Sequence, residues 1–226
     1  MRKAHKEGYK QPRQIWDKIW GIEKDDPLRI ENGKPVYNLS NDWIAMYPAL
    51  MPTKQGTRVL DLGCGLGNNT LYFCERGYDV LAADFSAVAL ESIRSTIPQA
   101  KTMFLDLTKS FPIDDNSFDI IVADYSLHYF AEQKTQEIMS EIKRVLKKQG
   151  ILLARVRAID RASIGMKYVQ IANNYYFTGK YNVRFFTAEE ARKYFSVIGK
   201  TTINEKDVIR YGECIKTIEA VVICED

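Results

Sequence analysis

The stretch Val59-Leu60-Asp61-Leu62-Gly63-Cys64-Gly65-Leu66-Gly67-Asn68 decides the fold of this chain. The apolar run Thr57–Leu60 predicts a strand before the glycines, and Asn68–Arg76 predicts a helix after them. Glycines let the backbone turn sharply and approach a ligand closely, and backbone N–H groups at such a turn can point at that ligand. The carboxylate of Asp61 disfavours a bound pyrophosphate and favours a ligand with a cationic end.

The composition is that of an ordinary globular protein. The chain has 226 residues, 46% apolar and 27% charged, which suits one domain or one domain with an appendage. A net charge of +3 is too small to indicate a polyanionic partner, and no stretch reaches the length of a membrane span. The N-terminal run Met1–Lys10 lacks the apolar centre of a signal peptide. The four cysteines form no CxxC pair, so we expect reduced thiols, a cytoplasmic location and no metal site.

Strands and helices alternate from residue 57 onward, which is typical of an α/β fold with a parallel sheet. The expected strands are Thr57–Leu62, Tyr78–Ala83, Lys101–Leu105, Phe118–Ala123 and Ile151–Val156. The expected helices between them are Asn68–Arg76, one capped by Ser86, and Glu132–Lys147, which Gly150 would end.

The two ends of the chain read differently. We expect residues 1–50 to form an N-terminal helical extension or cap, with Gln14–Trp20 and a run from Ser40 to Tyr47 as helices. Residues 51–226 would form the main domain, with a lid-like insertion at about 158–186. Thr187 and Glu190 predict a capping box, and Val197–Asp207 and Lys216–Cys224 predict an antiparallel hairpin at the sheet edge.

Four of the expected parallel strands end in a carboxylate: Asp61, Asp84, Asp106 and Asp124. A single such Asp is more typical of a turn, but ligands of open parallel sheets bind at these strand ends. Asp84, 23 residues after Asp61, suits a carboxylate that accepts both ribose hydroxyls of an adenosine.

The other three carboxylates suit the remaining parts of such a ligand. Asp106 could accept an adenine amine, between the apolar walls Phe85 and Leu107. Asp61 and Asp124 would face an ammonium or sulfonium group.

These motifs together resemble those of the class I S-adenosylmethionine-dependent methyltransferases. The resemblance covers about residues 57–156 and includes the glycine stretch, Phe104–Leu107, Phe118–Ala123 and Glu141–Gly150. It implies a Rossmann-like, seven-stranded, mostly parallel sheet with an antiparallel last strand and helices on both faces. Trp16–Trp20 and Leu127–Phe130 resemble segments of small stand-alone bacterial enzymes, tellurite-resistance-like ones included, that methylate small molecules.

The resemblance also implies a cofactor, S-adenosylmethionine, with S-adenosylhomocysteine as product, and residues that bind it. The sequence departs from the family pattern at one position, where Asn68 instead of a small residue follows the third glycine. We expect this departure to have little consequence. The implied cofactor-binding residues are Asp61, Gly63, Cys64 and Gly65 for the methionine part, Asp84 for the ribose, Phe85, Asp106 and Leu107 for the adenine, and Asp124.

For the acceptor, His128 is the candidate general base, because its titration range suits proton transfer near neutral pH. The alternative is a structural histidine. Arg155 or Arg184 could meet an anionic group of a small acceptor, or could bond to nearby acids instead. The other candidate substrate-binding residues are Trp20, Tyr125 and Tyr176, each of which could instead pack in the core.

The sequence therefore favours a monomeric or homodimeric methyltransferase that acts on a small molecule, with no metal and no membrane or nucleic-acid partner. An RNA (tRNA) or protein methyltransferase is the alternative, since the basic N-terminal tail could touch phosphates. A nicotinamide-dependent oxidoreductase fits poorly, because Asn68 replaces the last glycine of its fingerprint. The segment Asp124–Leu127 lacks the prolines of DNA amino-methylating enzymes. A non-catalytic module that binds the same cofactor also stays open.

Overall fold

The computed structural model describes residues 13–22, 29–31, 34–36, 43–52, 55–160, 168–210 and 213–225. The expected cap Ser40 and the turn at Tyr211-Gly212 lie outside these residues. The helices are α1 (Arg13–Ile22), η3 (Ile44–Met46), η4 (Pro48–Leu50), α2 (Asn68–Cys74), α3 (Ala87–Thr96), η5 (Leu127–Tyr129), α4 (Glu132–Val145) and α6 (Ala188–Phe195). The strands are β1 (Arg29–Glu31), β2 (Lys34–Val36), β3 (Arg58–Leu62), β4 (Asp79–Asp84), β5 (Lys101–Phe104), β6 (Phe118–Asp124), β7 (Leu146–Arg157), β8 (Val169–Ala172), β9 (Tyr175–Phe177), β10 (Asn182–Arg184), β11 (Gly199–Arg210) and β12 (Glu213–Cys224).

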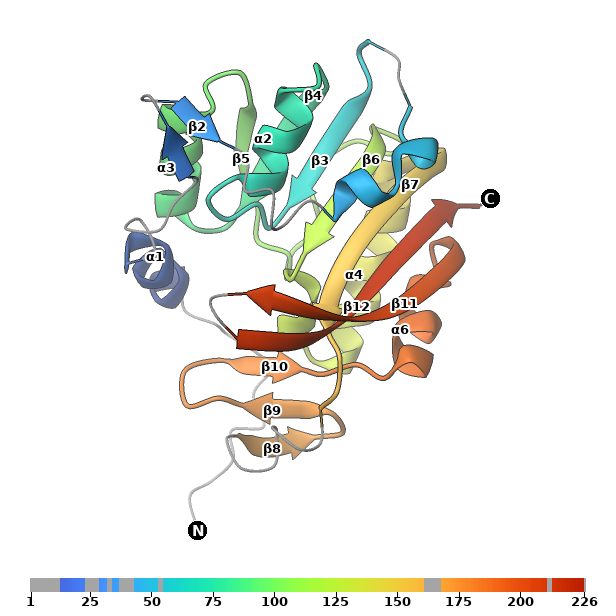
Figure 1. Ribbon diagram of the computed structural model, residues 1–226. Helices are drawn as coiled ribbons and strands as arrows, with labels where there is room; N and C mark the ends of the chain where they lie inside the picture. Colours follow the sequence, from blue (N-terminus) through green and yellow to red (C-terminus); the bar gives the residue numbers. More distant parts are fainter. Residues whose placement is uncertain are drawn as a thin grey trace.

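A seven-stranded sheet in the order β11-β12-β7-β6-β3-β4-β5 forms the centre of the molecule (Figure 1). Strands β3 to β7 pair in parallel, while β12 runs antiparallel to both β7 and β11. The first strand of this sheet in the chain, β3, lies in the middle of the sheet. The chain adds β4 and β5 on one side of β3 and then β6 and β7 on the other side, so the order in which strands are added switches between β3 and β6. This is the place where open α/β sheets bind ligands. The expected fold class is confirmed.

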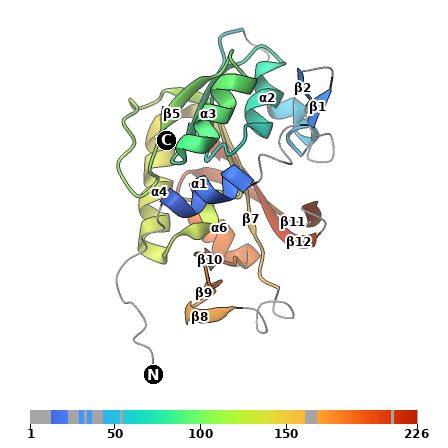
Figure 2. The same cartoon turned by 90° about the vertical axis from the view of Figure 1, so that its left-hand side faces the viewer.

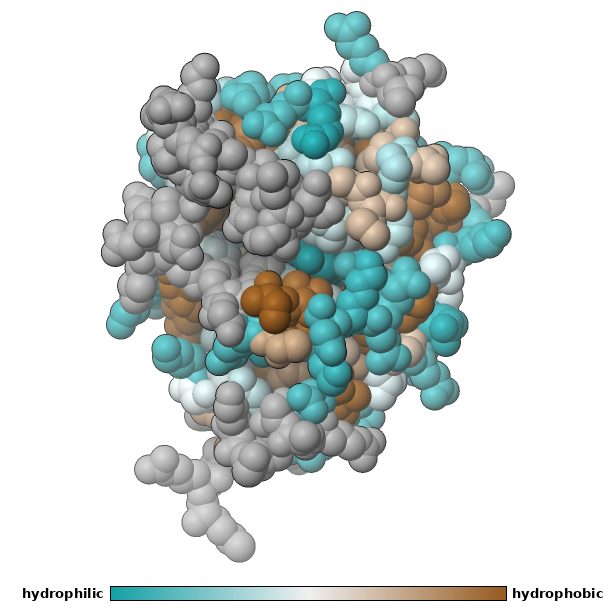
Figure 3. All heavy atoms as spheres, viewed as in Figure 1, coloured by the Kyte–Doolittle hydropathy of each residue, from teal (hydrophilic) through white to brown (hydrophobic). Residues whose placement is uncertain are grey.

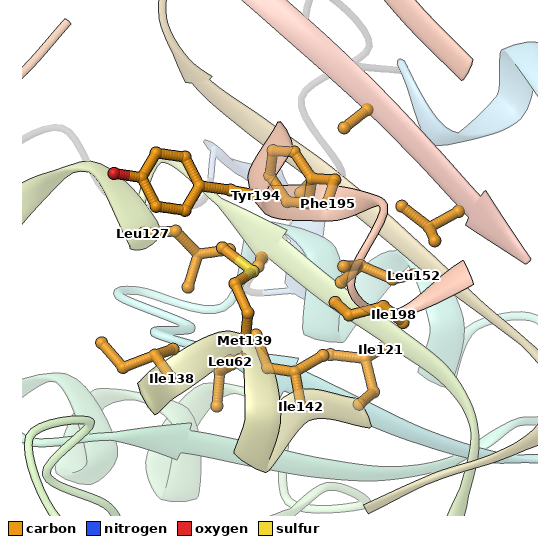
Figure 4. Packing of buried hydrophobic residues seen from close by; sticks show 14 of the residues in the cluster. Leu62, Ile121, Leu127, Ile138, Met139, Ile142, Leu152, Tyr194, Phe195 and Ile198 are labelled. Atoms are coloured by element: carbon orange, nitrogen blue, oxygen red, sulfur yellow. The ribbon is translucent and has the colours of Figure 1, made fainter. Parts of the chain in front are cut away.

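Alternating side chains of the strands feed two separate cores. On one face, Leu62 and Ile121 pack with Met139 of α4 and Phe195 of α6 (Figure 4). On the other face, alternate residues such as Val59 pack with α2, α3 and the segment 43–51. Helices on both faces exclude water from a strongly apolar sheet, which is why the strand interiors read as continuous apolar runs.

The end of α4 differs from the expectation. The helix ends at Val145 and β7 begins at Leu146, so Gly150 does not stop a helix but lies inside a strand. Leu146 pairs with Phe118 and the next pair joins Ile151 to Ile120, which leaves residues 147–150 as a bulge. A Cβ at Gly150 would lie 2.7 Å from the Lys147 carbonyl oxygen, so glycine is needed for this bulge rather than for a helix end.

The aromatic-rich stretch after β7 gave no clear period in the sequence, and it contains a second, three-stranded sheet in the order β10-β9-β8. One side of this sheet packs on its own small core around Val183 and Phe185. The strands have only three or four residues each, too few for a repeating pattern to stand out.

Apolar surface on the face in Figure 3 lies in separate areas bordered by polar side chains. Within the described part of the chain, the search for a helix long and apolar enough to cross a bilayer found none.

The capping box before α6 is present: the Thr187 hydroxyl accepts from the Glu190 N–H at 3.1 Å, and the Glu190 carboxylate accepts from the Thr187 N–H at 3.0 Å. We therefore expect Thr187→Ala to lower the free energy of unfolding by about 1 kcal/mol, a drop in Tm of roughly 2–4 °C. Thermal unfolding followed by circular dichroism measures this. Ser196→Ala, at the exposed end of the same helix, is the control, and an equal drop in both variants would contradict a role of the cap.

Candidate functional site

The glycine loop between β3 and α2 adopts a backbone that only glycine takes easily. Gly63, Gly65 and Gly67 have φ angles of 75°, 52° and 91°. A Cβ on Gly63 would clash with the Cβ of Ser126, which follows β6. The Ser126 hydroxyl in turn donates to the Leu62 carbonyl oxygen at 2.6 Å. The loop is thus wedged against the end of β6, as a site built from both segments requires.

The amides of this loop are bonded within the protein. The N–H groups of Gly63 and Cys64 both donate to the Ala83 carbonyl oxygen, at 2.7 and 3.0 Å. The Gly65 N–H donates to Asp84 Oδ2 at 3.0 Å. In the described structure these three N–H groups fix the loop to β4. That backbone N–H groups of Gly63 and Gly65 contact the methionine part of a ligand stays a prediction.

Asp61 is fully buried, and its carboxyl group has a strongly shifted pKa. Burial, together with the negative charges of Asp124 and Asp84, raises this pKa to about 7. The hydroxyl of Thr70 donates to Asp61 Oδ2 at 2.6 Å and opposes that shift. A cation placed near Asp61 would favour its ionised form, so this face of the loop suits a positively charged ligand.

Asp84 ends β4, is buried, and accepts hydrogen bonds with both oxygens. Its Oδ1 accepts from the Ser86 N–H at 2.8 Å, and its Oδ2 from Gly65. Burial raises the pKa of Asp84, while these backbone donors lower it. Asp106 is half-buried and accepts from the N–H and hydroxyl of Thr108 at 2.9 and 2.7 Å.

Asp61, Asp84 and Asp124 lie on the same face of the sheet. Each comes two residues after a strand residue of the core that α2 and α3 cover, and side chains two residues apart in a strand point to the same face. Phe85 and Leu107, the expected adenine walls, follow β4 and β5 and are half-buried.

Asp124, at the end of β6, forms a buried ion pair with Arg155. The guanidinium Nε lies 2.7 Å from Asp124 Oδ1, and Nη2 lies 2.9 Å from Oδ2. The Arg155 side chain is 2% exposed and stacks over the rings of Trp43 and Tyr125. This bidentate geometry satisfies the charge of Asp124 internally. A contact between Arg155 and an acceptor anion stays a prediction.

Tyr125 turns the chain sharply after β6. Its φ of 53° is unusual for a residue with a side chain. The Tyr125 N–H donates to the Arg155 carbonyl oxygen at 2.9 Å, and its hydroxyl is hydrogen-bonded to Thr217 of β12. These contacts fix the turn that carries η5, which holds His128.

His128 and a group of half-buried aromatic rings lie beyond this turn. His128 is 1% exposed, and its ring centroid lies 4.2 Å from that of Tyr129. Trp16 of α1 packs edge-on against Tyr129 at 4.8 Å and stacks with Tyr181 of the insertion at 5.7 Å. We call Trp16, Tyr129 and Tyr181 the aromatic mouth; they come from three separate elements.

Two of the three remaining expected acceptor residues, Arg184 and Tyr176, contact other parts of the protein. Arg184 is 4% exposed, donates to the Phe130 carbonyl oxygen at 3.3 Å and stacks over Tyr175. Tyr176 packs edge-on against Phe185 of the small core. Their roles toward an acceptor stay predictions.

Sequence reasoning missed three contributors. Asp17 of α1 accepts from the Ser86 hydroxyl at 2.6 Å, directly after β4. Thr70 bonds Asp61, and Tyr181 joins the aromatic mouth. The helical face of Trp16 and Trp20 was visible in the sequence, but its docking position was not.

Comparisons with known proteins agree with this geometry. The methyltransferase domain family matches residues 60–154, which include the glycine loop, β4 and β6. A SAM-dependent methyltransferase from Methanosarcina mazei superimposes with a TM-score of 0.66 at 19% identity, over 79% of this chain and 98% of that one. Residues 60–154 thus form a methyltransferase domain, and the fold around them is that of the class I methyltransferases. A TehB-like methyltransferase from Corynebacterium glutamicum also shares the fold, with a TM-score of 0.57, 18% identity, and coverage of 94% and 98%.

Curated relatives match this chain over only part of their length. The tRNA N(3)-cytidine methyltransferase METTL2 of Bos taurus is 31% identical over 156 residues, which are 63% of this chain and 41% of the relative. An uncharacterized methyltransferase of Synechocystis is 36% identical over 96 residues, 42% of this chain and 45% of the relative. The chain thus spans less than half the length of these two relatives.

The cofactor of this domain family is S-adenosylmethionine, and the residues of this chain fit it. Gly65 has no Cβ that would block a close approach, and the carboxylates of Asp61 and Asp84 on one sheet face suit a ligand that carries a sulfonium and an ammonium group. The Oδ1 atom of Asn69, beside the loop, is buried and accepts no hydrogen bond from the described residues. It could accept one from such a ligand.

Asp61 makes stability depend on pH. Because its pKa rises from 3.8 to about 7 on folding, the folded protein keeps a proton that the unfolded chain loses, and stability falls from about pH 4 to pH 7. We expect Asp61→Asn to remove this loss, so that the Tm of the variant exceeds that of wild type by roughly 5 °C at pH 8 and by less at pH 4.5. A pH series of thermal unfolding tests it, and a constant difference would contradict the assignment.

Proposed function

We propose that this chain transfers a methyl group from S-adenosylmethionine to a small molecule that enters at the aromatic mouth. One observation carries the proposal. The glycine loop with its buried carboxylates and the buried His128 lie at the same end of the parallel strands, and half-buried aromatic rings lie in front of the histidine. When bound, the cofactor supplies a methyl group on a positively charged sulfur, which is already a good leaving group.

The protein would then mainly position the two reactants and exclude water. The pair Asp124–Arg155 and the turn at Tyr125 hold η5 in place beside the donor loop. Trp16, Tyr129 and Tyr181 would line the entrance for the acceptor. Their rings are largely apolar but carry an indole N–H or a hydroxyl group, and this mixture is common in ligand pockets. His128 would accept a proton from an acceptor that is protonated at neutral pH.

A small acceptor is favoured by what the buried arginines contact. Arg155 is paired with Asp124, and Arg184 is stacked among aromatic rings, so neither guanidinium lies on the surface where phosphates of a nucleic acid would bind. The aromatic mouth would instead select acceptors with a flat or apolar body.

A tRNA cytidine is the second candidate acceptor. It is supported by the METTL2 relatives, which include a Drosophila protein 30% identical over 199 residues, 79% of this chain and 58% of the relative. Aromatic rings at the site would also suit an unstacked base.

The two candidates are separated by one assay. Release of S-adenosylhomocysteine is measured with a cell extract divided by ultrafiltration into small metabolites and macromolecules, with and without ribonuclease. Release driven by the small fraction supports a small-molecule acceptor. Release that needs the macromolecular fraction and is lost after ribonuclease would overturn it in favour of RNA, and loss after protease would favour a protein.

His128→Ala should lower kcat about 100-fold or more while the Kd for S-adenosylhomocysteine stays unchanged, because general-base catalysis contributes to the chemical step and not to donor binding. Initial rates with the identified acceptor and equilibrium titration of the donor product give the two values. Ser140→Ala, exposed on α4 and away from the site, is the control. A variant at position 128 with full turnover would leave His128 a structural residue.

A further inference from the structure

Helix α1 lies against the glycine loop between β3 and α2, which we assign to the methyl donor. In the view of Figure 2 it lies below α3. It reaches the carboxyl ends of two strands. Asp17 Oδ1 accepts the Ser86 hydroxyl hydrogen at 2.6 Å after β4, and the Arg13 guanidinium lies 5.3 Å from the centroid of Phe104, the last residue of β5. Ser86 is two residues after Asp84, the residue assigned to the ribose, and Phe104 is two residues before Asp106, assigned to the adenine.

Trp20 covers the face of Gly65 that glycine leaves open. A Cβ built on Gly65 would lie 2.9 Å from Cη2 and 3.0 Å from Cζ2 of the Trp20 indole. A glycine at this position allows a ligand to approach the backbone closely. In this structure the indole makes that close approach, so Trp20 takes the place next to Gly65 that a donor would use.

The carboxylate of the ribose position is engaged as well. Both oxygens of Asp84 accept backbone hydrogens, from Ser86 and from Gly65, and the negative charge of Asp17 lies near them. Each of these oxygens keeps a second lone pair with which it can still accept from a ribose hydroxyl. The Asp17 carboxylate next to Asp84 adds repulsion that its bond to Ser86 must overcome.

We propose that α1 is a gate that closes the donor site, and that Asp17 and Trp20 must leave Ser86 and Gly65 before S-adenosylmethionine or S-adenosylhomocysteine can enter. The proposal rests on the proposed function, since it assigns the donor to this loop.

The contacts that hold α1 on the domain are of a kind that can break, so that the helix moves away from the glycine loop. The helix has ten residues, and its described contacts to the domain include half-buried rings, the Arg13 guanidinium over the ring of Phe104 and the hydrogen bond of Asp17. Elements with few buried apolar contacts open at low free energy. Trp16 also contacts Tyr129 and Tyr181, so undocking would open the aromatic mouth at the same time.

A gate that occludes the site and a lid that covers bound ligand give opposite results when docking is weakened. Asp17→Ala removes the bond to Ser86. If α1 competes with the donor, the closed state loses stability and the apparent affinity for S-adenosylhomocysteine rises, by about tenfold for the loss of one hydrogen bond to a charged group. If α1 instead packs on the bound donor, the same change weakens the affinity.

Stopped-flow mixing with S-adenosylhomocysteine, followed by the fluorescence of the three tryptophans, measures both rate and affinity. For wild type we expect the observed rate to level off at high ligand, because opening of α1 limits it. Asp17→Ala should raise this limiting rate and lower Kd, and Trp20→Ala should act in the same direction. Lys18→Ala, exposed on the same helix, is the matched control and should behave as wild type.

Equal or weaker binding by Asp17→Ala, together with a rate that rises linearly with ligand in wild type, would overturn the gate and leave the proposed function intact. Failure of wild type and all variants to bind S-adenosylhomocysteine, with unchanged circular dichroism, would overturn the proposed function itself.

Discussion

Three buried carboxylates on one face of a parallel sheet are the constraint on which the rest of this site depends. Their mutual repulsion and their burial are both unfavourable, and the fold compensates each one differently. Asp124 has the guanidinium of Arg155, Asp84 has two backbone N–H groups, and Asp61 has the hydroxyl of Thr70 and a pKa raised to about 7. The charge of Asp61 is thus the least compensated, and a cationic ligand would complete its surroundings.

Much of the architecture can be understood as the means of holding these groups together. The period of two along each strand places the carboxylates on one face, and the glycine loop fits against Ser126 only because Gly63 has no side chain. The strained turn at Tyr125 is fixed from β7 and β12, strands that come late in the sequence. The site therefore needs the whole sheet, although its residues come from a short part of the chain.

The parallel strands, two helix N-caps and the strand-end carboxylates could be predicted from the sequence, because periodicity and local hydrogen bonds are encoded within a few residues. The caps of Ser86 and Thr187 are examples. The bulge at Gly150 could not, since the same glycine signal ends many helices, and the short strands of the insertion leave no period. The docking of α1 was also invisible, because Asp17 and Ser86 are 69 residues apart and meet only in three dimensions.

The most direct test of this account is the proton balance of donor binding. Titration calorimetry of S-adenosylmethionine at pH 6.5, in two buffers with different ionisation enthalpies, reports protons released on binding. If the cation lies near Asp61, it lowers the pKa of this carboxyl group, so binding should release about half a proton or more, and Asp61→Asn should abolish the release. A binding enthalpy that is equal in both buffers would contradict the central role of the buried carboxylates.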